Sequence, residues 1–150
     1  MGTENVIFFA VYELKKDLQY TVETYVMDTA GEYEKTNTGK REAYFGENVN
    51  VTPETIEEGF YLDTNNSVCT ATVKKTNEVV LKIYLARNKY YVAFDGENTE
   101  VEESKTGYYY HGSTITAPVD PVVEEYQNFN GWNVVFEDGT SKKVSFPYVV

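Results

Sequence analysis

The sequence is poor in the side chains that carry most enzyme chemistry. Its 150 residues hold one cysteine, one histidine, one tryptophan and two methionines. A single thiol, Cys69, cannot form an internal disulfide, and its Val- and Thr-rich neighbours favour an inert side chain in a strand. His111 has no cysteine or second histidine beside it, which makes a nucleophilic triad implausible. We therefore expect no catalytic residues, no cofactor and no metal site.

Acidic residues outnumber basic ones, but they form no recognisable catalytic or metal-binding pattern. The acidic cluster around Gly96 (Asp95, Glu97, Glu100, Glu102 and Glu103) lacks the spacing of a calcium-binding loop. No pair of carboxylates stands out for glycoside hydrolysis. We expect a solvated acidic surface there.

Positive charge and long hydrophobic runs are also scarce. Thirteen basic residues stand against 24 acidic ones, giving a net charge of −11. Binding to nucleic acid needs a basic surface, so nucleic acid is not an expected partner. No apolar run approaches the length of a membrane span, and we expect no membrane insertion. The sequence shows no signal peptide. The opening Met1-Gly2 resembles an added start, which predicts that the remaining residues come from a longer protein.

The chain is rich in residues that favour strands. It has 14 tyrosines, together with frequent Thr and Val, and no stretch reads as a long helix. Residues 19–27 and 79–85 alternate as half-buried strands do. Residues 67–73 and 78–86 are expected to pair as a hairpin. Thr52-Pro53 predicts a helix of about one turn, with Thr52 as its cap. Together these patterns predict a mainly β fold.

One motif occurs twice. Residues 44–53 and 110–118 both read as an aromatic residue, any residue, Gly, two polar residues, an apolar–polar–apolar run and then Pro. Self-similarity of this kind indicates an array of supersecondary units. We predict two small modules in tandem, residues 14–88 and 89–150, joined without a linker at Arg87-Asn88. Arrays of small β modules usually position or bind other molecules, which favours a non-catalytic protein.

Two sets of residues resemble known surface-protein repeats. The first set, residues 20–25, 31–33, 46–49, 59–60 and 80–90, resembles the mucin-binding-protein-like repeats of Gram-positive surface proteins. The second set, residues 90–96, 112–115 with Pro118, and 129–132, resembles the B-repeat of internalin-type proteins, also called the Listeria–Bacteroides repeat. Residues 119–126 depart from that pattern, because they are more apolar and acidic than the family's Pro/Thr-rich loop.

The resemblance implies a fold and a setting. It implies β-grasp-like α+β modules in tandem, each a mixed sheet with at most a short helix. It also implies a secreted, cell-wall-associated bacterial surface protein, located outside the cell and without catalytic residues. The function expected from it is that of an adhesion module or stalk spacer.

The N-terminal residues 1–13 suggest how copies join. B-repeat-like units commonly finish with a strand of the type found at residues 5–13, and the second module reaches Val150 before any such strand. Residues 1–13 are therefore expected to be the terminal strand of a preceding repeat. We hypothesise that this strand pairs with the second module of a neighbouring molecule or of the same one. The pairing residues would be Val6, Ile7, Phe8, Phe9 and Val11. Head-to-tail contacts that do not close would make a filament. Packing of residues 5–13 on the first module alone would contradict the hypothesis.

Two other functions stay open. A lectin-like module could bind mucin glycans, or another glycan or glycoprotein of the host or matrix, through Tyr108, Tyr109, Tyr110 and Trp132, since exposed aromatic rings stack on sugars. The competing interpretation places these tyrosines in cross-strand pairs and Trp132 in the core. The chain could instead be an accessory domain of a large secreted enzyme.

Overall fold

The computed structural model describes residues 5–97, 100–101 and 103–150, and it is mainly β, as predicted. The strands are β1 (Leu18–Met27), β2 (Tyr33–Ala43), β3 (Glu47–Asn50), β4 (Phe60–Leu62), β5 (Thr70–Val73), β6 (Val80–Arg87), β7 (Lys89–Val92), β8 (Gly107–Tyr110), β9 (Thr114–Ile115), β10 (Trp132–Val135), β11 (Ser141–Val144) and β12 (Tyr148–Val149). A 3-10 turn, η1, covers Glu103–Lys105. Within the described residues, no helix has the length and apolar character needed to cross a membrane.

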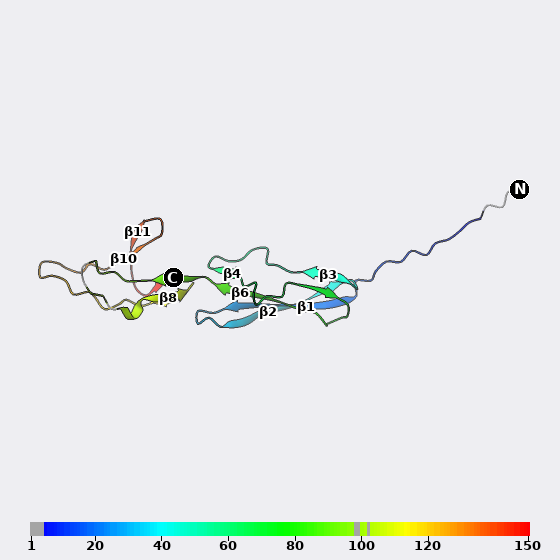
Figure 1. Ribbon diagram of the computed structural model, residues 1–150, viewed down its shortest axis with the longest axis horizontal. Coiled ribbons are helices and arrows are strands. Elements are labelled where there is room, and N and C mark those ends of the chain that lie inside the picture. Colours follow the sequence, from blue (N-terminus) through cyan, green and yellow to red (C-terminus); the bar gives the residue numbers. More distant parts are fainter. Residues whose placement is uncertain (1–4, 98–99, 102) are drawn as a thin grey trace.

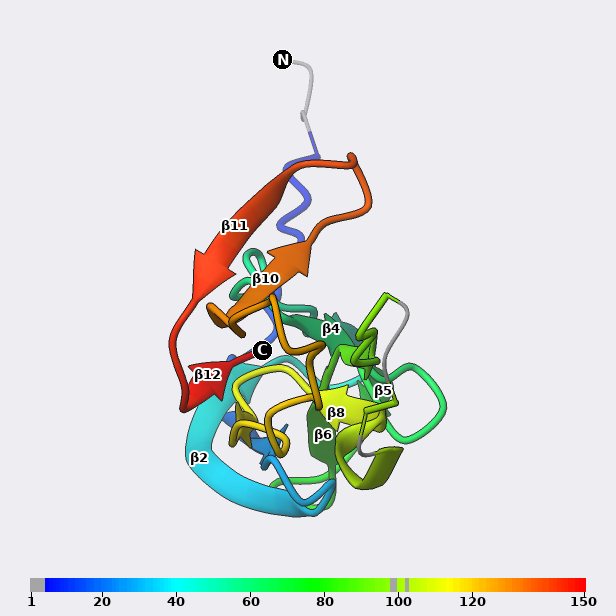
Figure 2. The ribbon, with the colours of Figure 1, turned by 90° about the vertical axis from the view of Figure 1, so that its left-hand side faces the viewer.

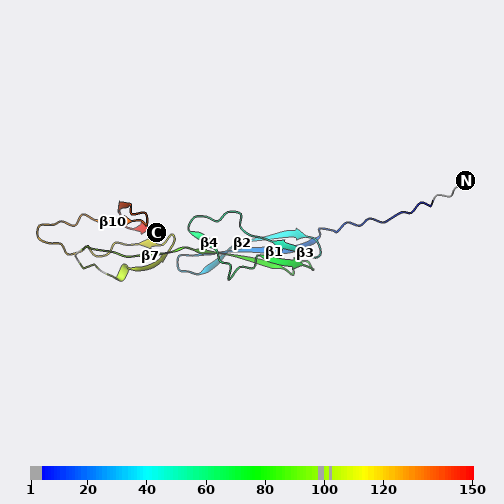
Figure 3. The same cartoon turned by 45° about the horizontal axis from the view of Figure 1, so that its top comes forward.

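The strands fall into two groups on either side of Asn88. Every ladder between described strands joins two members of β1–β6 or two members of β7–β12. The two groups lie end to end along the long axis of the molecule (Figures 1 and 3). We call residues 14–88 the first module and residues 89–150 the second module.

The first module is built on a mixed sheet of order β2-β1-β6-β4. β1 and β2 form an antiparallel hairpin, and the carboxylate of Asp28 closes its turn by accepting the N–H groups of Ala30 and Glu32. β6 runs parallel to β1 over six paired positions, from Thr21 opposite Val80 to Val26 opposite Leu85. The two strands at the centre of the sheet are therefore the first and the last of the module.

The core of the first module lies between this sheet and the β3–β5 ladder. Alternate residues of the central strands are buried: Tyr20 and Val22 on β1, Leu81 and Ile83 on β6. Val73 of β5 covers them from the second layer and is itself fully buried. The alternation predicted for residues 19–27 and 79–85 is thus confirmed.

Two local predictions in this module are wrong. Residues 67–73 do not form a hairpin with 78–86: β5 pairs with β3, and one isolated bridge, Val68 to Lys82, joins the two stretches. The reason is that β6 lies inside the sheet, where β1 and β4 occupy its two edges. The helix expected at Thr52 does not form either. The N–H of Val51 bonds to the carbonyl of Cys69 at 2.9 Å, so the backbone continues the strand pairing instead of meeting the cost of nucleating a short helix.

The second module is less completely packed. Its ladders, β7–β8, β9–β12 and β10–β11, each have two strands. Seen end on, the β10–β11 hairpin projects to one side of the body, away from β8 (Figure 2). Of the buried hydrophobic residues in the described chain, Ile115 is the one contributed by this module. Among the described residues, the second module therefore has a much smaller buried core than the first.

The two copies of the repeated motif fold in the same way. Gly46 and Gly112 have φ angles of 79° and 80°, in the left-handed region that glycine favours. In each copy, the residue after the glycine donates its N–H to the carbonyl of the preceding tyrosine, Tyr44 or Tyr110. The repeat seen in the sequence is therefore a repeated turn.

The strands that follow the two turns are also equivalent. The N–H of Gly46 bonds to the carbonyl of Val73 at the end of β5, and that of Gly112 bonds to the carbonyl of Val150 just after β12. β3 pairs antiparallel with β5, and β9 pairs antiparallel with β12. With the β1–β2 and β7–β8 hairpins, these pairs give the two modules a shared plan. β6, which lies beside β1, has no counterpart paired with β7 in the described residues.

Residues 5–17 make no strand and no ladder in the described chain. They extend away from the first module, at the end opposite to the second module (Figure 1). Residues 5–13 are exposed throughout, so they do not pack on the first module. Pairing of this segment with a second module stays a prediction.

Candidate functional site

The aromatic residues predicted to bind a ligand do not form one site. Tyr108, Tyr109 and Tyr110 are consecutive on β8, so alternate side chains point to opposite faces of the β7–β8 ladder. Tyr109 donates its hydroxyl to the carbonyl of Lys105 at 2.7 Å, which fixes it to the turn η1. Trp132 lies on a different ladder, at the start of β10. Each of these residues therefore has its own surroundings.

Tyr108 makes an exposed aromatic pair with Tyr91. The two residues are opposite one another on β7 and β8, and their ring centroids are 5.1 Å apart. Tyr108 is 68% exposed and Tyr91 61% exposed, which is high for such large rings. The pair is a cross-strand contact, and it also presents aromatic surface to solvent. Tyr91 was not among the residues singled out from the sequence, although it directly follows Tyr90 in the resemblance motif.

Tyr110 belongs to the contact between the modules. Its ring lies against the turn between β1 and β2, where a β-carbon on Gly31 would be 3.0 Å from the ring's Cε2 and from its hydroxyl. The Nζ of Lys89 lies 4.7 Å from the ring centroid on a cation–π approach. Tyr110 thus packs across the module boundary.

His111 also packs across this boundary. Its ring lies so close to Gly59 that any β-carbon at position 59 would overlap it. It makes edge contacts with Phe60 and Tyr90, with centroid distances of 6.2 and 6.1 Å. His111 therefore helps to hold the two modules together. The residue that points to this contact in the sequence is Gly59, which stands directly before the strand that His111 covers.

Arg87 ties the two modules together through hydrogen bonds. Its Nε donates to the carbonyl of Met27 in the first module, and its Nη1 donates to the carbonyl of His111 in the second, both at 2.7 Å. The guanidinium also lies 4.7 Å from the ring centroid of Phe60. The planar guanidinium carries several donors in fixed positions, so it can bridge the two carbonyl groups. A lysine ammonium group does not have this geometry. The sequence showed Arg87 as part of a short joint but gave no sign of this bridge.

The backbone at Asn88 completes the connection. Its N–H bonds to the carbonyl of Gly59 in the first module, and its carbonyl accepts the N–H of His111 in the second, each at 2.8 Å. One residue between β6 and β7 is therefore held from both sides. We call Gly59, Phe60, Arg87, Asn88, Tyr110 and His111 the junction. It fixes the direction in which the second module continues from the first.

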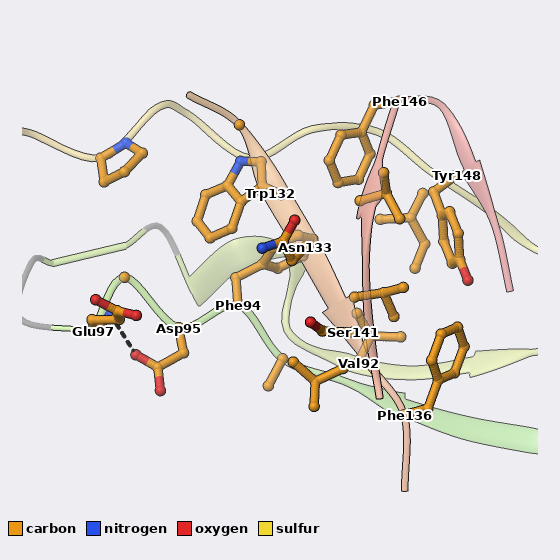
Figure 4. A pocket seen from close by; sticks show the side chains of 18 of the residues that line it. Val92, Phe94, Asp95, Glu97, Trp132, Asn133, Phe136, Ser141, Phe146 and Tyr148 are labelled. Atoms are coloured by element: carbon orange, nitrogen blue, oxygen red, sulfur yellow. Dashed lines mark hydrogen bonds between the residues drawn. The ribbon is translucent and has the colours of Figure 1, made fainter. Parts of the chain in front are cut away.

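An open groove of about 1540 Å³ lies in the second module. Its walls are β7 with the residues that follow it, β10, and the end of the chain around Phe146 and Tyr148 (Figure 4). Trp132 packs in this groove against Phe94 and Phe129, with centroids 5.3 and 5.5 Å apart. Its Nε1 is buried and has no hydrogen-bond acceptor among the described residues. Trp132 is thus part of an aromatic cluster that is only half buried.

The titrating groups whose pKa values shift are held by local hydrogen bonds. The hydroxyl of Tyr33 donates to Asp63 at 2.7 Å, and the side-chain and backbone N–H groups of Asn66 donate to the same carboxylate. These bonds lower the pKa of Asp63 below its usual range, while burial and the nearby carboxylate raise the pKa of Tyr33. Both residues stabilise the end of the first module that faces the junction.

Neither acids nor a thiol gather into a reactive centre in the part of the chain that the structure describes. There, no group of three His, Cys, Asp or Glu side chains is placed to hold a metal ion. Of the acidic cluster, Glu102 lies outside the described residues, and Asp95 accepts the N–H of Glu97 at 2.7 Å. Cys69 is a free, half-buried thiol next to the core.

No protein-family model, no curated protein sequence and no solved structure matches this chain.

Proposed function

We propose that this chain is a non-catalytic, tension-bearing spacer in a secreted, cell-wall-associated bacterial surface protein. The observation that carries the proposal is the parallel pairing of β1 with β6, the first and last strands of the first module. A pull on the two ends of this module draws β1 and β6 in opposite directions along their own length. The hydrogen bonds between them are then loaded together in shear, and they do not open one after another.

The junction transmits such a load into the second module. β6 leads through Asn88 directly into β7, and Arg87 bonds to both modules across that point. The two modules lie in line (Figure 1). A row of modules with fixed joints keeps a terminal binding domain away from the wall, which is what a stalk requires. The extracellular location in this proposal comes from the resemblance to surface-protein repeats, and the acidic surface is compatible with it.

The proposal can be tested by displaying the chain on a bacterial cell between a wall anchor and a binding domain of known ligand. Cells carrying the chain should be retained on a ligand-coated surface under flow better than cells carrying a Gly/Ser linker of equal length. The Arg87→Lys variant, with a weakened junction, should fall between them. Equal retention for all three would contradict the spacer function.

Glycan binding is a second candidate, favoured by the exposed pair Tyr91–Tyr108. In this reading the module is an adhesin that contacts host or matrix glycans through these two rings. A glycan array that gives hits with the chain, and loses them with Tyr108→Ala but not with Tyr61→Ala, would support it. Tyr61 is a suitable control because it is half exposed on β4 of the first module. An array without hits would remove this candidate.

A further inference from the structure

We propose that residues 5–13 of one copy insert beside β7 in the groove of a second copy, so that copies join head to tail by strand exchange. This inference is independent of the spacer function, because it concerns how copies associate and not what load they carry. It starts from two exposed apolar features of the same chain.

The first feature is the N-terminal segment itself. Phe8 and Phe9 are 91% and 84% exposed, and Val6, Ile7 and Val11 are also exposed. A soluble protein rarely leaves such a continuous apolar stretch in water unless the stretch has a partner. Its apolar side chains occupy both faces of an extended chain, which suits a strand that is covered on both sides.

The second feature is the groove along β7. β7 pairs with β8 on one side, and no described strand pairs with it on the other. All four residues of β7 line the groove, together with Phe94, Trp132 and Phe146. A strand laid there would bond to the edge of β7 and cover the half-buried aromatic cluster shown in Figure 4. It would also bring backbone carbonyl oxygens close to the groove, where the Nε1 of Trp132 has no acceptor among the described residues.

The first module shows what such a strand does. β6 lies beside β1 and buries Leu81 and Ile83 on one face. On its other face Tyr84 stacks on Tyr25 with centroids 4.5 Å apart. The two modules share the plan of hairpin, glycine turn and antiparallel pair, so the side of β7 away from β8 corresponds to the side of β1 that β6 covers. β6 directly precedes β7 in the sequence and pairs with β1, the first strand of the module before β7. Residues 5–13 precede β1 in the same way. They are therefore placed to pair with the first strand, β7, of a module that precedes β1.

The distances require a second copy. Residues 14–17 connect the segment to β1, and four residues span at most about 14 Å. β1, with ten residues, extends roughly 33 Å, and β7 lies beyond its far end because β6 runs parallel to β1 and leads into β7. Residue 13 therefore stays within about 14 Å of the start of β1, so the segment as a whole cannot lie along the groove of its own chain. Each copy that donates its segment still has its own groove free for the segment of a further copy. The copies therefore join in a row, and the contact does not close into a ring.

The direct experiment measures the mass of the 150-residue chain by sedimentation over a range of concentrations. The expected average mass rises with concentration above the 17.1 kDa of one chain. The donor variant Phe8→Asp/Phe9→Asp should keep the mass of a single chain at every concentration. The matched control Val122→Asp/Tyr126→Asp adds the same charge at two exposed apolar residues that do not line the groove, and should associate like the unmodified chain. A mass that stays at 17.1 kDa for the unmodified chain, or association that survives in the donor variant, overturns the proposal.

A second measurement places the contact. Trp132 is the one tryptophan of the sequence and lies in the groove, so its emission reports on the groove alone. A synthetic peptide of residues 5–13, added to the donor variant, should bind saturably and shift the Trp132 emission to shorter wavelength, and a scrambled peptide should not. An unchanged emission at saturating peptide would contradict the proposed site. Failure of either test leaves the mechanical test of the first module unaffected, so the two proposals can fail separately.

Discussion

The ring of His111 lies directly against the α-carbon of Gly59, across the boundary between the two modules. This contact leaves no room for a side chain at position 59. Gly59 of the first module and His111 of the second module therefore pack together as one unit.

Gly59→Ala should destabilise the chain more than Gly46→Ala. Both glycines have positive φ angles, 84° and 79°, so alanine costs roughly 1–2 kcal/mol at either position. At Gly59 the new methyl group also meets His111, whereas at Gly46 nothing lies within contact range. Urea unfolding of both variants measures the difference. Equal losses of stability would show that His111 does not pack on Gly59.

Replacing Arg87 with lysine should loosen the junction while leaving the first module folded. Lysine keeps the charge but cannot donate to the carbonyls of Met27 and His111 in the geometry of the guanidinium fork. Each hydrogen bond from a charged group contributes about 1.5–3 kcal/mol. Residual dipolar couplings should fit one common alignment for the two modules in the unmodified chain and two separate alignments in Arg87→Lys. The exposed Arg41→Lys serves as the control, and the same common alignment in all three proteins would argue against a bridging role.

Acid should weaken the first module through Asp63. Its pKa is lowered in the folded chain by hydrogen bonds from Tyr33 and Asn66, so its contribution to stability is present above the ordinary pKa of 3.8. The contribution falls as the pH drops through the lower, folded value. Tyr33→Phe removes the leading cause of the shift and should flatten this dependence. Urea midpoints measured between about pH 2 and 5 give the test, and parallel curves for the two proteins would refute it.

The two modules should differ in local stability. The first module supplies nearly all the buried hydrophobic residues of the described chain, and the second supplies Ile115. Amide hydrogen exchange should therefore be faster in β7–β12 than in β1 and β6. Where copies associate, or where the peptide of residues 5–13 is bound, exchange in β7 should slow. Uniform protection across both modules in the single chain would contradict the difference in packing.

The sequence predicts the general fold well because strand patterns are local. The alternation in residues 19–27 and 79–85 correctly gives the buried faces of β1 and β6. The repeated motif corresponds to two equivalent glycine turns. The partner of each strand is a long-range property, so the β5–β6 hairpin was a wrong prediction. Nothing in the local pattern shows that β6 would be taken into the middle of a sheet beside β1.

The candidate site shows the same limit. Tyr108 to Tyr110 stand together in the sequence, but their environments differ because neighbouring residues on a strand face opposite ways. Arg87 and His111 stand far apart in the sequence and meet only because the modules are placed end to end. Sequence reasoning found the aromatic residues and the short joint. The hydrogen bonds that stiffen the joint could not be predicted from the sequence, because the tertiary fold brings their donors and acceptors together.

The central claim is that the first module bears load through β1 and β6, and single-molecule pulling tests it most directly. Handles at residues 17 and 88 load these two strands in shear. Handles at residues 17 and 44 instead peel the β1–β2 hairpin open from its paired ends, Leu18 and Ala43. We expect a markedly higher unfolding force in the first geometry than in the second, in the same chain under the same loading rate. Equal forces, or a higher force for peeling, would contradict the claim.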